Sequence, residues 1–162
     1  MAYDKQNVVH CIGLLYLTVA YLPDQKVSGE EKNEMAERLA GWLRAYEWDV
    51  NQDGVIDKND AAKIFVDDLL PHFSEIGTQG LVEEVHRMGD FILSQTYWND
   101  DTSMSLFKQL LLVASADGIL TKSAINIIDI IAGSFRIKEN EDFISMMDEM
   151  NELAVDKENI DE

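Results

Sequence analysis

The residues of this chain best suited to chemistry lie in one short polar segment, residues 49–60. Five of its oxygen-bearing side chains lie at alternate positions and again near the end of the segment; they are Asp49, Asn51, Asp53, Asp57 and Asp60. Calcium takes about six to eight oxygen ligands and needs a sharply turned backbone to gather them. Gly54 directly follows the first three of these residues and permits such a turn. The spacing therefore predicts a site for a divalent cation, with Ca²⁺ as the first candidate.

The same segment resembles the calcium loop of EF-hand proteins, D-x-[DN]-x-[DN]-G through its first six positions. The resemblance implies side-chain ligands at loop positions 1, 3, 5 and 12, a direct or water-mediated ligand at position 9, and a backbone carbonyl ligand at position 7. These positions hold, in that order, Asp49, Asn51, Asp53, Asp60, Asp57 and Val55. Ile56 at position 8 is expected to face inward, between an entering helix at 35–48 and an exiting helix at 59–70.

One residue departs from the EF-hand pattern. The usual closing residue is Glu, whereas Asp60 is one methylene shorter, a substitution also met in dockerin modules. We therefore expect Mg²⁺ to compete with Ca²⁺ at this loop. No second loop of this kind is present to pair with it.

A metal-free interpretation of this segment stays open. Asp53 and Gly54 could form a plain turn between two helices, with Asp57 or Asp60 capping the helix that follows. This alternative explains two of the acids, but it does not explain four acids and an asparagine at the spacing that calcium requires.

The apolar residues recur at intervals of three and four, which predicts an all-α fold without strands. We expect about seven helices, near 6–22, 29–48, 58–71, 78–98, 103–116, 121–136 and 139–153, in a single domain at 1–153 that is followed by an acidic tail at 154–162. Pro71 is expected to end the third helix. The first helix is the most apolar one, and it is too short for a membrane span.

The chain also resembles itself at an offset of 93 residues. The apolar run that ends at Asp24 aligns with the run that ends at Asp117, and Ser28 aligns with Thr121. Each half therefore reads as an apolar helix, an Asp-containing turn, an N-cap and an amphipathic helix.

With these turns the chain resembles the TerB-like tellurite-resistance family, an all-helical fold of two related halves, here about 6–48 and 103–150. The resemblance implies a role in tellurite resistance or another metal or chemical stress response. It also implies acids that face one another across the two halves, which in this sequence are Asp24, Glu31 and Asp117. The fourth position holds Ala124, and Gln25 stands where a glycine is expected. Helix capping explains the same acids without any metal, because Ser28 and Glu31 fit a capping box.

Acidic residues outnumber basic ones by 31 to 13, which gives a formal net charge of −18. Such a charge repels phosphate backbones and anionic lipids, so we expect neither a nucleic-acid partner nor membrane insertion, and cations or basic proteins stay open as partners. Ten of the acids lie in residues 139–162. The single cysteine, Cys11, fits a reducing compartment, and we expect a cytoplasmic protein.

Taken together, these patterns predict a non-enzymatic calcium-binding protein. Two alternatives stay open. One is a metal-dependent enzyme that uses Asp24, Glu31 and Asp117, and the other is an interaction scaffold that uses a methionine-rich stripe on the last helix, Phe143, Met146, Met147, Met150 and Leu153. His10, His72 and His86 lack metal-site spacing and are expected to be packed or surface residues.

Overall fold

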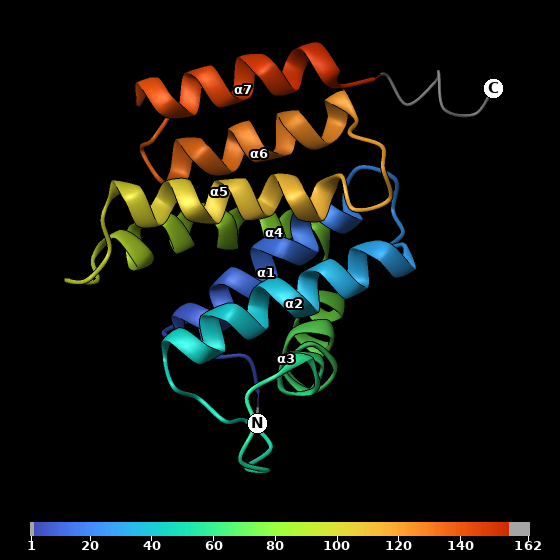
Figure 1. Ribbon diagram of the computed structural model, residues 1–162, viewed down its shortest axis with the longest axis vertical. Coiled ribbons are helices and arrows are strands. Elements are labelled where there is room, and N and C mark those ends of the chain that lie inside the picture. The colour runs from blue at the N-terminus through green and yellow to red at the C-terminus, as the bar shows by residue number, and fades with distance from the viewer. Residues whose placement is uncertain (1, 156–162) are drawn as a thin grey trace.

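A computed structural model of the chain describes residues 2–155, which form an all-helical fold (Figure 1). The helices are α1 (Val8–Tyr21), α2 (Gly29–Ala45), α3 (Lys58–Ile64), the π-helix η1 (Phe65–Leu69), α4 (Leu70–Leu93), α5 (Asp100–Ala114), α6 (Lys122–Ser134) and α7 (Glu141–Leu153). Because α3, η1 and α4 follow one another directly, the described residues make six continuous helical segments where seven were expected. They contain no strand, only an isolated bridge between Thr121 and Val155. The all-α prediction is confirmed.

The long third segment bends at Gly77, whereas the sequence predicted an end at Pro71. A proline ring presses on the carbonyl four residues back and normally ends or kinks a helix. Here a π-helix precedes Pro71, and the N–H of Leu70 bonds to the carbonyl of Phe65. The helix continues through this wider turn until Gly77, where φ is +67° and ψ is −177°. Only glycine adopts that conformation readily, so the bend falls there.

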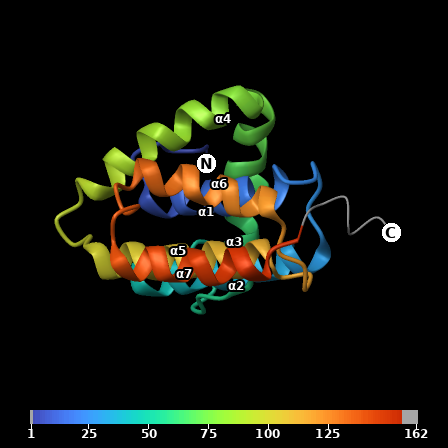
Figure 2. The same ribbon diagram turned by 90° about the horizontal axis from the view of Figure 1, so that it is seen from above.

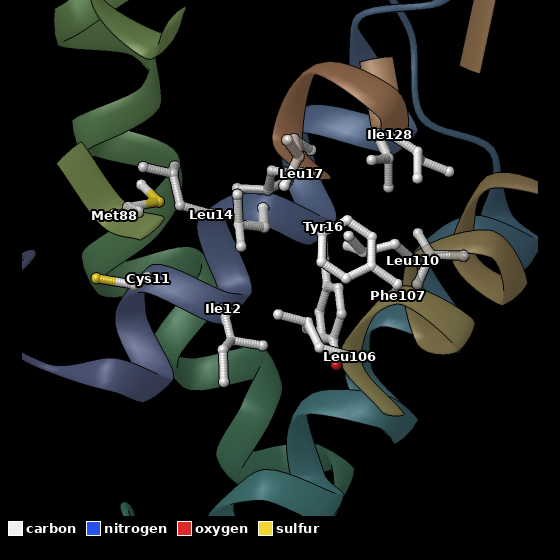
Figure 3. Close-up of a cluster of buried hydrophobic side chains, with 14 of the residues drawn as sticks. Cys11, Ile12, Leu14, Tyr16, Leu17, Met88, Leu106, Phe107, Leu110 and Ile128 are labelled. Atoms are coloured by element: carbon white, nitrogen blue, oxygen red, sulfur yellow. The ribbon is translucent and has the colours of Figure 1, made fainter. Parts of the chain in front are cut away.

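Helix α1 lies in the middle of the fold and contacts α2, α4, α5, α6 and η1 (Figures 1 and 2). Thirteen of its fourteen residues are buried, so the predicted buried first helix is confirmed. Figure 3 shows Ile12 and Tyr16 of α1 among side chains of the later helices. Cys11 is buried there too, and burial raises the pKa of its thiol to about 11. The thiol is therefore protonated at neutral pH.

Helix α7 forms the outer layer and packs on α6 (Figure 1). In its predicted stripe, Phe143 and Met147 are buried, whereas Leu153 is 68% exposed. Val155 pairs with the turn before α6, since its N–H donates to the Leu120 carbonyl and its own carbonyl accepts from the N–H of Lys122, both at 2.9 Å. The rest of the expected acidic tail, 156–162, lies outside the described residues. No helix within residues 2–155 combines the length and the apolarity that crossing a bilayer requires.

The turns that follow α1 and α5 share one local geometry at the offset of 93. In each, an aspartate accepts a hydrogen bond from the N–H two residues on: Asp24 from Lys26 at 3.3 Å, and Asp117 from Ile119 at 3.0 Å. The residue after the aspartate is left-handed in both, with φ of 66° at Gln25 and 87° at Gly118. A hydroxyl residue then caps the next helix in each half, Ser28 for α2 and Thr121 for α6. Gln25 therefore adopts a left-handed backbone conformation, and the equivalent position of the other turn holds a glycine, Gly118.

His10 is fully buried at the start of α1. Its Nδ1 accepts a hydrogen bond from the N–H of Asp4 at 2.9 Å, and its Nε2 lies 3.4 Å from Oδ2 of the buried Asp68. Burial lowers the pKa of His10 below its ordinary 6.5, although Asp68 and Asp4 act in the opposite direction. His72 is partly buried and stacks on Tyr3, and His86 is exposed, so the expectation of packed or surface histidines is confirmed.

The lowered pKa of His10 predicts a pH dependence of stability. The unfolded chain binds a proton at this site at a higher pH than the folded chain does, so stability is lost as the pH falls below about 6.5 and through the folded pKa. His10→Asn keeps an acceptor at the position of Nδ1 for the Asp4 N–H but does not titrate. We expect urea unfolding at pH 7 and pH 5 to show a smaller loss for His10→Asn than for wild type. His86→Asn should behave like wild type, and equal losses in all three would contradict the assignment.

The two turns predict opposite effects of exchanging their left-handed residues. A side chain in this conformation costs about 1–2 kcal/mol relative to the right-handed one. Gln25→Gly should therefore raise the free energy of unfolding by about 1 kcal/mol, after allowance for the greater freedom of glycine in the unfolded chain. Gly118→Gln should lower it by about 1–2 kcal/mol. Denaturant unfolding of both variants measures this, and destabilisation by Gln25→Gly would show that the Gln25 side chain matters more than its backbone.

Candidate metal centre

The loop at 49–60 projects from the end of the molecule opposite α7 (Figure 1). Helix α2, predicted to reach Trp48, ends earlier, at Ala45. The reason is a left-handed Glu47 with φ of 54°, after which the N–H of Trp48 returns to the Leu43 carbonyl at 2.9 Å. This turn directs the Trp48 ring toward His10, with ring centroids 5.9 Å apart. The loop therefore starts from a residue anchored at the N-terminal end of α1.

Three of the predicted ligands converge in this loop. Asp49, Asp53 and Asp60 each offer a carboxylate oxygen, and these oxygens all lie within 4.8 Å of one another. Among residues 2–155, no other group of three histidine, cysteine or acidic side chains meets that condition. Asp53 is exposed, Asp49 is half-buried and Asp60 is fully buried. The group therefore opens to solvent on one side and is anchored in the protein on the other.

Backbone N–H groups hold the first and the last of these three carboxylates, Asp49 and Asp60, in place. Both oxygens of Asp49 accept such bonds, from Gln52 at 3.1 Å and Gly54 at 2.8 Å. Both oxygens of Asp60 do the same, with Asn51 at 3.0 Å and Asp57 at 2.9 Å. A carboxylate has about four acceptor sites, so these bonds leave lone pairs free for a cation.

The pKa of the Asp60 carboxyl is lowered in spite of burial. Burial alone would raise this pKa, but hydrogen bonds from the backbone N–H groups of Asp57 and Asn51 outweigh it. Asp60 is therefore ionised at neutral pH, as a metal ligand must be.

The remaining predicted residues have mixed placements. Gly54 at loop position 6 has φ of +86°, so it makes the sharp turn that the motif predicted. Ile56 packs against the core as expected. Asp57 accepts from the N–H of Asn59 at 2.9 Å and forms a capping box with Asp60 at the start of α3.

Asn51 and Val55 contribute in a different way. The side chain of Asn51 accepts from the N–H of Asp53 at 3.3 Å, and that of Asp53 accepts from the N–H of Val55 at 3.0 Å. These two hydrogen bonds hold the exposed backbone at 51–55 in a compact conformation. Helix capping thus accounts for Asp57 and part of Asp60, whereas it leaves the convergence of Asp49 and Asp53 on Asp60 unexplained.

One residue that the sequence pattern did not predict braces the loop. Arg44, in the last turn of α2, donates from Nε to the Ile56 carbonyl at 3.0 Å. Nothing in the local pattern marks this arginine, because the contact depends on how the loop folds back on α2. It joins the end of the entering helix to the second half of the loop.

The second predicted acidic group also comes together, but more loosely. Asp24, Glu31 and Asp117 line one open pocket of about 380 Å³, between the two turns that share the offset of 93. The carboxylate oxygens of these three side chains do not all lie within 4.8 Å of one another, whereas those of the three loop aspartates do. Each of the three also accepts a backbone N–H in its own turn or cap, including Glu31 from Ser28 at 2.9 Å.

Glu31 differs electrostatically from Asp60. It is only 6% exposed, and burial raises its pKa, with smaller contributions in the same direction from Asp117 and Asp24; the Ser28 hydrogen bonds oppose them. Its counterpart Ala124 is equally buried but carries no charge. The pocket therefore holds three acids, and the surroundings of one of them, Glu31, disfavour its ionised form.

No protein-family model matches this chain, and comparison with curated proteins and with solved structures also produced no match. The resemblance to the TerB-like family, and the EF-hand identity of the loop, therefore stay predictions that rest on the residues quoted above.

Proposed function

We propose that this chain is a non-enzymatic calcium-binding protein and that loop 49–60 is its site. The observation that carries the proposal is the convergence of Asp49, Asp53 and Asp60 within 4.8 Å at loop positions 1, 5 and 12. Asn51 and Asp57 supply further oxygens from positions 3 and 9, and Val55 supplies the carbonyl at position 7. Mg²⁺ is the expected competitor, because it also prefers oxygen ligands.

The proposed ion acts by removing repulsion. Three carboxylates at such short separation repel one another, and hydrogen bonds from the backbone offset only part of this cost. A divalent cation neutralises the group and draws the exposed Asp53 toward the buried Asp60. Because the loop connects only α2 and α3, we expect local ordering of the loop and not a change in the whole fold.

The biological setting follows from the resemblance alone. A TerB-like chain that binds calcium would take part in tellurite resistance or in another response to metal or chemical stress. Fold-level analogy is weaker support than the geometry of a site, so the physical part of the proposal is the binding of a divalent cation at 49–60.

A second candidate is a metal-dependent enzyme, which the shared pocket of Asp24, Glu31 and Asp117 favours. It requires one ion to reach all three acids, and their separation and their roles in the turns count against this. The first candidate is therefore preferred.

Calcium binding is measured by isothermal titration calorimetry on metal-free protein. We expect one site, and Asp49→Ala and Asp53→Ala should each weaken it by at least tenfold, since each removes a charged ligand. At a free concentration of about 100 Kd the ion should raise the free energy of unfolding by roughly 2.7 kcal/mol.

Asp24→Asn is the matched control, because it removes an acid from the other pocket. It should leave calcium affinity unchanged if the loop is the site. Loss of binding in Asp24→Asn, with binding intact in Asp49→Ala, would transfer the site to the other pocket. If Ca²⁺ produces neither a heat of binding nor an increase in stability, calcium binding is refuted both for loop 49–60 and for the pocket that contains Asp24.

A further inference from the structure

An apolar groove runs along the side of the molecule where α1, the turn after it and the start of α2 face α3, η1 and the first turns of α4. It consists of two hollows of about 290 and 430 Å³ that share Leu17, Val27 and Leu70 as lining residues. Leu17 is almost fully buried, whereas Leu70 is 43% and Val66 is 62% exposed. Apolar side chains left in water at the lip of a hollow mark a surface suited to an apolar ligand.

The groove is long as well as apolar. Its lining residues extend from Ala62 in α3 to Thr78 beyond the bend in α4. Sixteen residues of helix rise about 24 Å, less the effect of the bend. The π-helix η1 lies in the middle of this stretch, and helices of this type frequently occur at functional sites. A groove of this length and volume fits an extended acyl chain better than it fits a compact ligand.

One of the two hollows carries a charge. Lys32 is the one charged side chain among its described lining residues. The other cations of α2 and α3 already have partners. Three pair with carboxylates, Arg38 with Glu34, Lys58 with Glu37, and Lys63 with Asp67, and Arg44 donates to the Ile56 carbonyl. The ammonium group of Lys32 makes no hydrogen bond or ion pair with any described residue. It is a free cation next to apolar surface in a chain of net charge −18.

We propose that this groove binds a single-chain carboxylate amphiphile, that is, a long-chain fatty acid. The carboxylate pairs with Lys32, and the acyl chain lies over Leu17 and Leu70 toward Phe73. The acidic surface elsewhere repels an anionic ligand, so an apolar hollow with its own unpaired ammonium is where such a ligand gains both apolar contact and charge pairing. This site is separate from loop 49–60 and does not depend on calcium binding there.

The test uses the full chain in buffer with EDTA and a fluorescent fatty acid, cis-parinaric acid, below its micelle concentration. We expect saturable binding, displaced by dodecanoate more strongly than by dodecanol or dodecyltrimethylammonium, which have the same chain length. Equal displacement by all three would overturn the assignment of the head group to Lys32. No saturable binding would overturn the site altogether.

Variants then locate the ligand. Lys32→Met keeps an apolar side chain of similar length and should weaken binding roughly fivefold, the effect of one exposed ion pair, and Lys32→Arg should restore it. Val66→Asp should abolish binding, whereas Val82→Asp, at an exposed apolar residue outside the groove, should not change it. Circular dichroism confirms that each variant folds. If Val82→Asp weakens binding as much as Val66→Asp does, or Lys32→Met has no effect, the proposed pose is wrong.

Discussion

The burial of α1 on every side is the constraint on which the rest of the structure depends. Helices from both halves of the chain must surround it, and they do so at close range: a Cβ atom on Gly13 would lie 2.4 Å from the Leu69 side chain of η1. A polar side chain within such a helix needs a hydrogen-bond partner inside the protein, as Thr18 has in the Leu14 carbonyl. The groups that could do chemistry lie instead at its two ends. His10 and the Trp48 that leads into loop 49–60 lie at one end, and the turn with Asp24 lies at the other.

This arrangement explains why the helices and the loop could be predicted from the sequence, and why certain boundaries could not. Apolar spacing fixes which residues enter the core, so α1 and the all-α class follow from local pattern. The end of α2 depends instead on Glu47 adopting a left-handed conformation, which nothing in its chemistry favours. The end predicted at Pro71 was wrong because the wider turn of a π-helix precedes the proline, and no sequence pattern marks that π-helix. The residues of the candidate site were predictable because metal chemistry specifies their spacing, whereas the brace from Arg44 was not.

In loop 49–60, capping and metal binding are compatible uses of the same atoms. Asp57 and Asp60 satisfy N–H groups at the start of α3, and Asp49 satisfies those of the turn. Without these bonds the loop would lose its shape whenever the ion left. With them, the carboxylates are already positioned, and less ordering is needed when the ion binds. The feature that first favoured a metal-free interpretation is therefore also one that makes cation binding more favourable.

The two acidic groups of the chain differ in whether the surrounding protein favours the ionised carboxylate. At Asp60, N–H donors from Asn51 and Asp57 stabilise the charged form, and the neighbouring acids remain close enough for one ion to reach. At Glu31, burial and two other acids oppose the charged form, and the position that could add a fourth ligand is Ala124. An ion in that pocket would have to overcome this penalty with fewer ligands at greater separation. Since both groups lie in the same chain under the same conditions, a divalent cation should occupy the loop first, and the turns of the two halves then keep their acids for holding backbone and helix ends in place.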